Sequence, residues 1–286
     1  YLARNDFGKA NATMQTALNM ADKKDEAHYN LAKLIYQKEV KQGNMPYPQW
    51  NLDLALAETN KAYALNPLPL YKHLEAQIIY FKGEYAKAYD QFMALTKTNL
   101  RNGELYYEAA QCKQQLKAPF KEILTLLDSA VTAQDVSLSA PYVLARGTAL
   151  HGAQQYKKAM ADYNRYDTLM LGRASHDFYY TRALCEVQLR QFQQALNDFA
   201  HAIVLNREEP TYYAELAQLQ LRVNQKDDAV ATADLGLRIA PNYPDLYLIK
   251  GLALVNDNKK AEGLVALNKA KELGDTRADD LIKKYK

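Results

Sequence analysis

The sequence predicts an all-α protein: an α-α superhelix in which about seven and a half helix pairs follow one another, with a short helix at the C-terminus. Glycine and proline together make up 20 of the 286 residues, or 7%. In an ordinary globular protein they make up roughly 12%. A β-sandwich or barrel, which needs a turn about every 8–12 residues, is therefore disfavoured. In addition, small residues return at intervals of about 35 residues, the period of a helical repeat.

The second helix of each unit is centred on a small or apolar anchor residue. The anchors are Ala10, Ala55, Ala88, Ile123, Ala159, Ala195, Ala229 and Gly263. An aromatic residue or a leucine stands three positions before most anchors, and Lys226 and Lys260 replace it near the C-terminus. Mostly apolar residues follow at four and seven positions after the anchor. These offsets fall on one face of an α-helix, so each segment predicts an amphipathic helix B.

The first helix of each unit has its own small residue, twelve positions before the anchor. These residues are Ala76, Gly147, Ala183, Ala217 and Gly251, with Ala110 one residue out of register and Ala32 displaced by an insertion. Polar or turn residues such as Lys82–Glu84 and Asn256–Asn258 lie between the two helices and predict a short αα turn. Prolines stand between one unit and the next, where a helix must stop; they are Pro67, Pro141, Pro210, Pro241 and Pro244.

The pattern resembles the tetratricopeptide repeat, whose consensus of about 34 residues has small residues on both helices, an aromatic residue before the helix-B alanine and a proline in the link. The best matches are Tyr179–Arg207, Tyr213–Pro241 and Tyr247–Asp275. The resemblance implies one solenoid over residues 1–286. Its expected parts are a partial repeat (1–22), a repeat with an insertion at 40–49 (25–67), further repeats (69–100, 104–135, 140–171, 176–208, 210–241, 244–275) and a cap helix (277–286). Pentatricopeptide repeats, of similar length, are the alternative, and they would form an RNA-reading groove.

Two connecting segments are longer than the repeat requires. Lys38–Trp50 adds about eleven residues between helices A and B of the first complete unit, including two prolines and the only tryptophan. We expect a projecting loop, or an extra turn of helix followed by a turn. A tolerated insertion and a loop that contacts a partner are both consistent with it. The link Asp167–Asp177 contains Leu169, Met170 and Leu171, which could cover an apolar edge or expose one.

The sequence carries no signature of catalysis. Its histidines are scattered without the spacing of a metal site, and no GxSxG or GxGxxG motif occurs. We interpret Asp227 and Asp228 as solvated residues at a helix start and not as an acid/base pair. Cys112 and Cys185 lie in separate helical segments and are expected to be buried, inert thiols. We therefore predict a protein that is not an enzyme and holds no metal or cofactor.

Charge disfavours nucleic acid as a partner. The 36 Lys and Arg residues nearly balance 33 Asp and Glu, the net charge is +3, and the charges alternate along the helices without a basic patch. No stretch of 18 apolar residues occurs in the sequence, so we expect no segment that spans a membrane. The chain begins at Tyr1 inside a periodic segment, so we expect it to be a piece of a longer one. No motif in the sequence indicates the oligomeric state or the cellular location. The protein could be cytoplasmic or, if an upstream signal was removed, periplasmic or envelope-associated in a bacterium.

The family resemblance implies where a partner would bind. In tetratricopeptide repeat proteins helix A lines the concave face, one and two residues after the consensus aromatic and at further steps of three or four. Carried over to this chain, the partner-binding residues are Tyr29, Asn30, Lys33, Tyr36, His73, Gln77, Tyr80, Tyr107, Gln111, Gln114, Tyr180, Thr181, Gln218 and Arg222. Tyrosines and amides suit an extended or helical polypeptide, whereas the Lys, Arg and Asn clamp that some family members use for acidic C-terminal tails is missing.

The predicted function is therefore a protein-protein interaction scaffold that binds a peptide or protein segment in the concave groove. The alternative is a structural or assembly subunit that uses its convex face or its chain ends for self-association or for docking into a larger complex.

Overall fold

In the computed structural model, which describes residues 7–42, 49–98, 100, 103–133 and 138–285, all regular structure is helical and no strand occurs in these residues. The predicted all-α class is confirmed. The helices are α1 (Phe7–Met20), α2 (Lys24–Gln42), α3 (Gln49–Leu65), α4 (Pro69–Phe81), α5 (Tyr85–Leu95), α6 (Gly103–Gln115), α7 (Phe120–Thr132), α8 (Ala140–Gly152), α9 (Tyr156–Met170), α10 (His176–Gln188), α11 (Phe192–Leu205), α12 (Pro210–Arg222), α13 (Lys226–Ile239), α14 (Pro244–Asn256), α15 (Lys260–Glu272) and α16 (Arg277–Tyr285).

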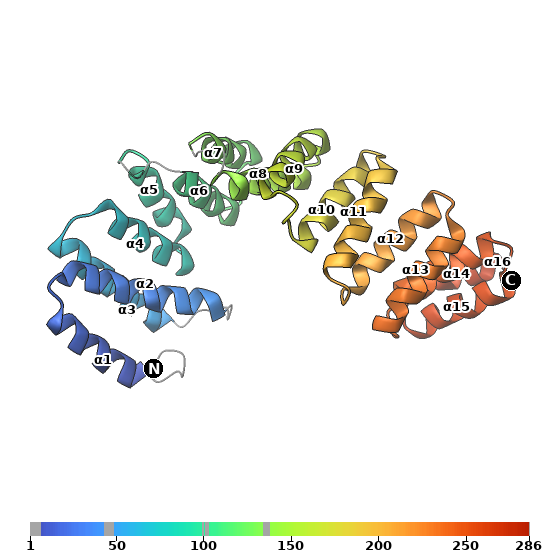
Figure 1. The fold of residues 1–286 in the computed structure, drawn as a ribbon, viewed down its shortest axis with the longest axis horizontal. Helices are drawn as coiled ribbons and strands as arrows, with labels where there is room; N and C mark the ends of the chain where they lie inside the picture. Colours follow the sequence, from blue (N-terminus) through green and yellow to red (C-terminus); the bar gives the residue numbers. More distant parts are fainter. Residues whose placement is uncertain (1–6, 43–48, 99, 101–102, 134–137, 286) are drawn as a thin grey trace. The chain divides into compact units, whose positions relative to one another are not determined.

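The helices form pairs that follow one another along the chain (Figure 1). The two members of a pair pack together, α2 on α3, α4 on α5, α6 on α7, α10 on α11, α12 on α13 and α14 on α15. At the C-terminus α16 packs on α15, in the place of the expected cap helix. The chain divides into two compact units, residues 1–146 (unit 1) and 147–286 (unit 2), with the boundary inside α8.

Small anchor residues are buried where the two helices of a pair meet. Ala55, Ala88 and Ala195 have no exposed surface. A Cβ atom added to Gly263 would lie 2.9 Å from the carbonyl oxygen of Gly251, so the backbones of α14 and α15 touch at these two glycines. The core is thus distributed between successive helices, as a repeat architecture requires.

The turns from helix A to helix B share one backbone conformation from α4 onward. Each contains a residue with positive φ, between 54° and 83°: Gly83, Lys117, Gln154, Arg190, Asn224 and Asn258. The next residue donates its N–H to a carbonyl five positions earlier, for example Glu84 N to Ile79 O at 3.2 Å and Gln191 N to Glu186 O at 2.9 Å. This is the Schellman motif, which satisfies carbonyls at a helix end.

Three prolines in the links stand at the start of the following helix. Pro69, Pro210 and Pro244 occupy the first position of α4, α12 and α14. Proline is favoured there because the missing N–H would have no partner in the first turn and its fixed φ suits the helix.

The two long connecting segments differ from the regular repeat in different ways. Helix α2 extends to Gln42 and α3 starts at Gln49, so the insertion expected at 40–49 begins with extra helix, while 43–48 lie outside the described residues. In the link after α9, Leu171 is 76% exposed and has a φ of 52°. This link therefore exposes an apolar side chain.

Both cysteines are buried within helices α6 and α10, with no exposed surface. Burial raises the pKa of Cys112 to about 12 and that of Cys185 to about 11. These thiols are therefore protonated at neutral pH and unreactive, as expected. No helix in the described part of the chain is both long and apolar enough to cross a lipid bilayer.

Candidate binding surface

The candidate partner-binding residues of unit 1 all lie on the first helix of a pair. We name them the helix-A surface of unit 1: Tyr29, Asn30, Lys33 and Tyr36 on α2, His73, Gln77 and Tyr80 on α4, and Tyr107, Gln111 and Gln114 on α6. Steps of three and four residues place the members from one helix on one side of it.

Burial separates these ten residues into three groups. Asn30, Lys33 and Gln114 are exposed, whereas His73 is buried, with 8% of its surface exposed. The others are half-buried: Tyr29, Tyr36, Gln77, Tyr80, Tyr107 and Gln111. His73 is thus mainly a contact between helices and offers a partner little surface.

Polar contacts join α4 to α6 within this surface. The Nε2 atom of His73 lies 2.5 Å from Oε2 of Glu108, and Gln77 Nε2 donates to Glu108 Oε1 at 2.6 Å. Burial disfavours the charged imidazole, but the hydrogen bond and charge of Glu108 outweigh it and raise the pKa of His73. His73 and Glu108 are 35 residues apart, so equivalent positions of successive repeats face each other.

Tyrosine rings pack from one helix A onto the next. In unit 1 the ring centroids of Tyr29 and Tyr71 are 5.0 Å apart, and those of Tyr107 and Tyr142 are 5.6 Å apart. Burial raises the pKa of Tyr29 and of Tyr107, so both hydroxyls stay protonated at neutral pH. The rings of these tyrosines therefore pack between repeats, and their hydroxyl groups can form polar contacts.

In unit 2 the candidate residues again lie on first helices. We name Tyr180 and Thr181 on α10 and Gln218 and Arg222 on α12 the helix-A surface of unit 2. Tyr180 packs against Tyr212 with a centroid distance of 4.9 Å. The Arg222 guanidinium lies over the Phe192 ring, 4.7 Å from its centroid. Gln218 and Arg222 are exposed, and Tyr180 and Thr181 are half-buried.

Solved structures of helical-repeat proteins are similar to this chain. YrrB, described as a TPR protein with an unusual peptide-binding site, aligns with a TM-score of 0.60 at 19% identity, over 68% of this chain and 97% of its own. A tetratricopeptide repeat protein from Parabacteroides merdae aligns with a TM-score of 0.53 at 15% identity, over 90% of this chain and 98% of its own. The chain has the tetratricopeptide repeat fold.

MamA aligns with the same fold at a TM-score of 0.55 and 19% identity, over 62% of this chain and 94% of its own. Neither a protein-family model nor a curated protein matches the sequence. At these identities the likeness establishes the tetratricopeptide repeat architecture, while function depends on the side chains at each surface.

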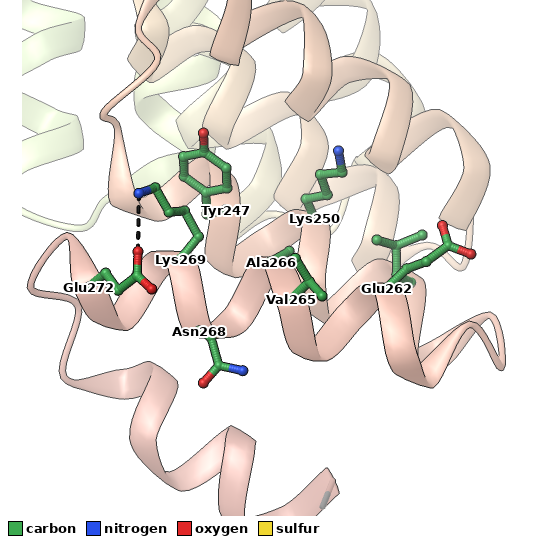
Figure 2. A pocket seen from close by; sticks show the side chains of 9 residues that line it. Tyr247, Lys250, Glu262, Val265, Ala266, Asn268, Lys269 and Glu272 are labelled. Carbon is green, nitrogen blue, oxygen red and sulfur yellow. Dashed lines mark hydrogen bonds and ion pairs between the residues drawn. The ribbon is translucent and has the colours of Figure 1, made fainter.

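A cavity of about 580 Å³ lies on the last helix pair of this tetratricopeptide array. Figure 2 shows its lining, which comes from α14 and α15: Tyr247, Lys250, Leu254, Glu262, Val265, Ala266, Asn268, Lys269 and Glu272. Val265 is 72% exposed, and Lys269 Nζ pairs with Glu272 Oε2 at 3.1 Å. The helix-A positions of the repeat pattern do not predict this cavity, because most of its lining belongs to helix B.

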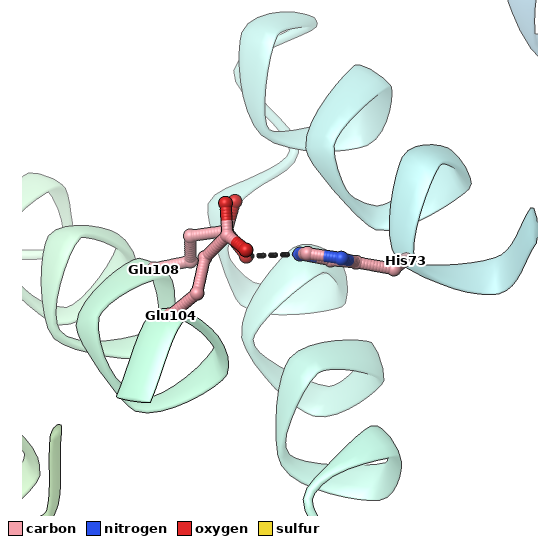
Figure 3. Close-up of side chains that lie close together, drawn as sticks. All are labelled: His73, Glu104 and Glu108. Carbon is pink, nitrogen blue, oxygen red and sulfur yellow. Dashed lines mark hydrogen bonds and ion pairs between the residues drawn. The ribbon is translucent and has the colours of Figure 1, made fainter. Parts of the chain in front are cut away.

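A group of side chains able to hold a metal ion is also not predicted by the sequence pattern. One ligand atom each of His73, Glu104 and Glu108 lies within 4.8 Å of the others (Figure 3). The spacing rules for metal sites compare residues within one helix, whereas these three come from α4 and α6. The signal that could have found them is the repeat period itself, which brings His73 opposite Glu108.

Proposed function

We propose that this protein is an interaction scaffold and that its helix-A surfaces bind an extended or helical segment of another polypeptide. The observation that carries the proposal is the composition of these surfaces. In unit 1, α2 and α6 present exposed Asn30, Lys33 and Gln114, and each of α2, α4 and α6 contributes at least one half-buried tyrosine. Amide side chains both donate and accept, so they can pair with a peptide backbone, and tyrosine rings supply apolar area.

Photo-crosslinking at single positions tests the proposal. Gln114 in unit 1 and Gln218 in unit 2 are exposed, and no hydrogen bond to either side chain is found among the described residues, so a photoreactive amino acid at either site should leave the fold intact. Gln194 on α11 is an exposed glutamine on a second helix and serves as the matched control.

We expect covalent adducts with cellular polypeptides at the two helix-A positions and few or none at Gln194. Mass spectrometry of the adducts identifies the partner and the segment that contacts the scaffold. Equal labelling at all three sites, or labelling at Gln194 alone, would contradict binding at the helix-A surfaces.

The second candidate function is docking through the second helices, and exposed apolar side chains in unit 2 favour it. Val204 on α11, Leu235 on α13 and Val265 on α15 are 65%, 48% and 72% exposed. A contiguous apolar patch built from such side chains is typical of a surface that another protein covers. If this role is the main one, Val265→Glu should abolish association measured by light scattering, while variants at Gln114 and Gln218 should have no effect.

A further inference from the structure

A histidine and two glutamates converge between α4 and α6 in unit 1. Figure 3 shows the carboxylates of Glu104 and Glu108 side by side, both facing the imidazole of His73. Glu104 and Glu108 are one helical turn apart on α6, so both side chains project from the same face. His73 reaches them from the neighbouring helix A.

The surrounding side chains hold two of the three groups in place. The His73 ring packs edge-on against Phe92, with centroids 6.0 Å apart and an interplanar angle of 78°. Gln77 Nε2 donates to the second Glu108 oxygen, Oε1, at 2.6 Å, and lies 3.4 Å from His73 Nε2. Carboxylates that bind a metal are usually held by a further hydrogen bond of this kind.

The cluster has two carboxylates and only one group, His73, that can carry a positive charge. In the part of the chain that the structure describes, no lysine or arginine forms an ion pair with Glu104 or Glu108. The Glu104 and Glu108 carboxylates come within 4.8 Å of each other. A cation placed between two such like charges stabilises both.

We propose that His73, Glu104 and Glu108 form a binding site for a divalent transition-metal ion, with Zn²⁺ as the reference ion. One imidazole nitrogen and two carboxylate oxygens suit zinc or manganese, whereas Ca²⁺ and Mg²⁺ prefer oxygen ligands alone. In a tetrahedral zinc site with bonds of about 2.0–2.2 Å, neighbouring ligand atoms are about 3.4 Å apart.

Only a small rearrangement would admit the ion. The His73–Glu108 contact of 2.5 Å opens by about 1 Å to reach the separation of two zinc ligands. Glu104 is exposed, so its carboxylate can rotate inward, and the solvent side of the ion stays open for a further ligand. Metal binding replaces the hydrogen bond between His73 Nε2 and Glu108 and releases its proton.

Another histidine–glutamate contact in unit 1 provides a matched control. His28 Nδ1 lies 2.6 Å from Glu58 Oε2, nearly the same distance, but Lys61 Nζ pairs with the other Glu58 oxygen at 2.7 Å. A metal ion there would meet an ammonium group and a single carboxylate. The His28–Glu58 pair is therefore not expected to bind a metal.

The test is titration of the intact, chelator-treated chain with Zn²⁺ by calorimetry, with Co²⁺ absorption as a spectroscopic report of coordination. We expect saturable binding of about one Zn²⁺ per chain that millimolar Ca²⁺ or Mg²⁺ does not displace. E104Q and E108Q should each weaken it at least about tenfold, the size reached even by losing an outer-shell partner, and H28Q should leave it unchanged. Circular dichroism checks that each variant is folded.

Three results would overturn the proposal. They are no saturable Zn²⁺ binding by the unmodified chain, equal affinity in folded E104Q and E108Q, and a loss in H28Q as large as in the glutamate variants. None of these results affects the crosslinking test, because that test requires no metal.

Discussion

The contact between the backbones of α14 and α15 makes Gly263→Ala the sharpest test of the packing. A Cβ atom on residue 263 would lie 2.4 Å from Cγ2 of Val255, 2.9 Å from the Val255 nitrogen and 2.9 Å from the carbonyl oxygen of Gly251. Two of these three atoms belong to the backbone and cannot rotate away. The two helices would have to separate by several tenths of an ångström or more.

The expected loss of stability is the balance of two terms. Overpacking of a tight contact costs about 1–3 kcal/mol, and alanine in place of glycine inside a helix returns about 1 kcal/mol. Because two of the clashing atoms belong to the backbone, we take the upper part of the overpacking range, about 2–3 kcal/mol, and expect Gly263→Ala to lower the free energy of unfolding by about 1–2 kcal/mol. Gly152, the last residue of α8, has no atom within 4 Å of an added Cβ, so Gly152→Ala should raise it, by up to about 1 kcal/mol.

Urea denaturation followed by circular dichroism measures both variants. Because repeat proteins can unfold in parts, hydrogen exchange of the amides in α14 and α15 should locate the loss in Gly263→Ala. If Gly263→Ala is as stable as the unmodified chain, or more stable, the two helices do not approach as closely as described and the reasoning fails.

Other predictions concern the core, the turns and a buried carboxylate. Ala195 is fully buried, so Ala195→Leu should lower the free energy of unfolding by about 1–3 kcal/mol. An unchanged thermal midpoint would contradict the position of Ala195 between two helices. Arg190→Gly should raise the free energy of unfolding and Gly83→Ala should lower it, each by about 0.5–1 kcal/mol, because both positions have positive φ; the opposite order would contradict the shared turn. Burial and the charge of Asp198 raise the pKa of Glu186 to about 7, from 4.5. The folded chain then binds more protons than the unfolded one between about pH 4.5 and 7, so its stability should fall, by up to about 3 kcal/mol, as the pH rises through this window. Glu186→Gln should remove that fall in denaturation curves measured at several pH values.

Much of the fold could be predicted because the repeat is carried by packing. A position such as Ala195 accepts only a small residue, so the requirement is written into the sequence at every period. The turns are different. Gly83 is of a residue type that favours the left-handed conformation and so indicates its turn. Lys117 and Arg190 adopt the same conformation although their residue types disfavour it, because the hydrogen bonds of the Schellman motif compensate for the strain.

The candidate surface could be predicted less completely than the fold. Helical spacing placed Asn30 and Gln114 on first helices, where they are exposed. It could not show that His73 turns toward Glu108, since burial depends on which side chains of the neighbouring repeat meet it. For the same reason Glu104 was not recognised: its importance comes from a histidine on another helix.

Because the thiols of Cys112 and Cys185 are buried, this chain is convenient for cysteine-directed labelling at other positions. Neither sulfur is accessible or ionised near neutral pH, so maleimide reagents should ignore both in the folded state. A single cysteine introduced at an exposed position would then be the sole attachment point for a fluorophore or spin probe, and ligand titrations could be followed without first removing the native sulfhydryls.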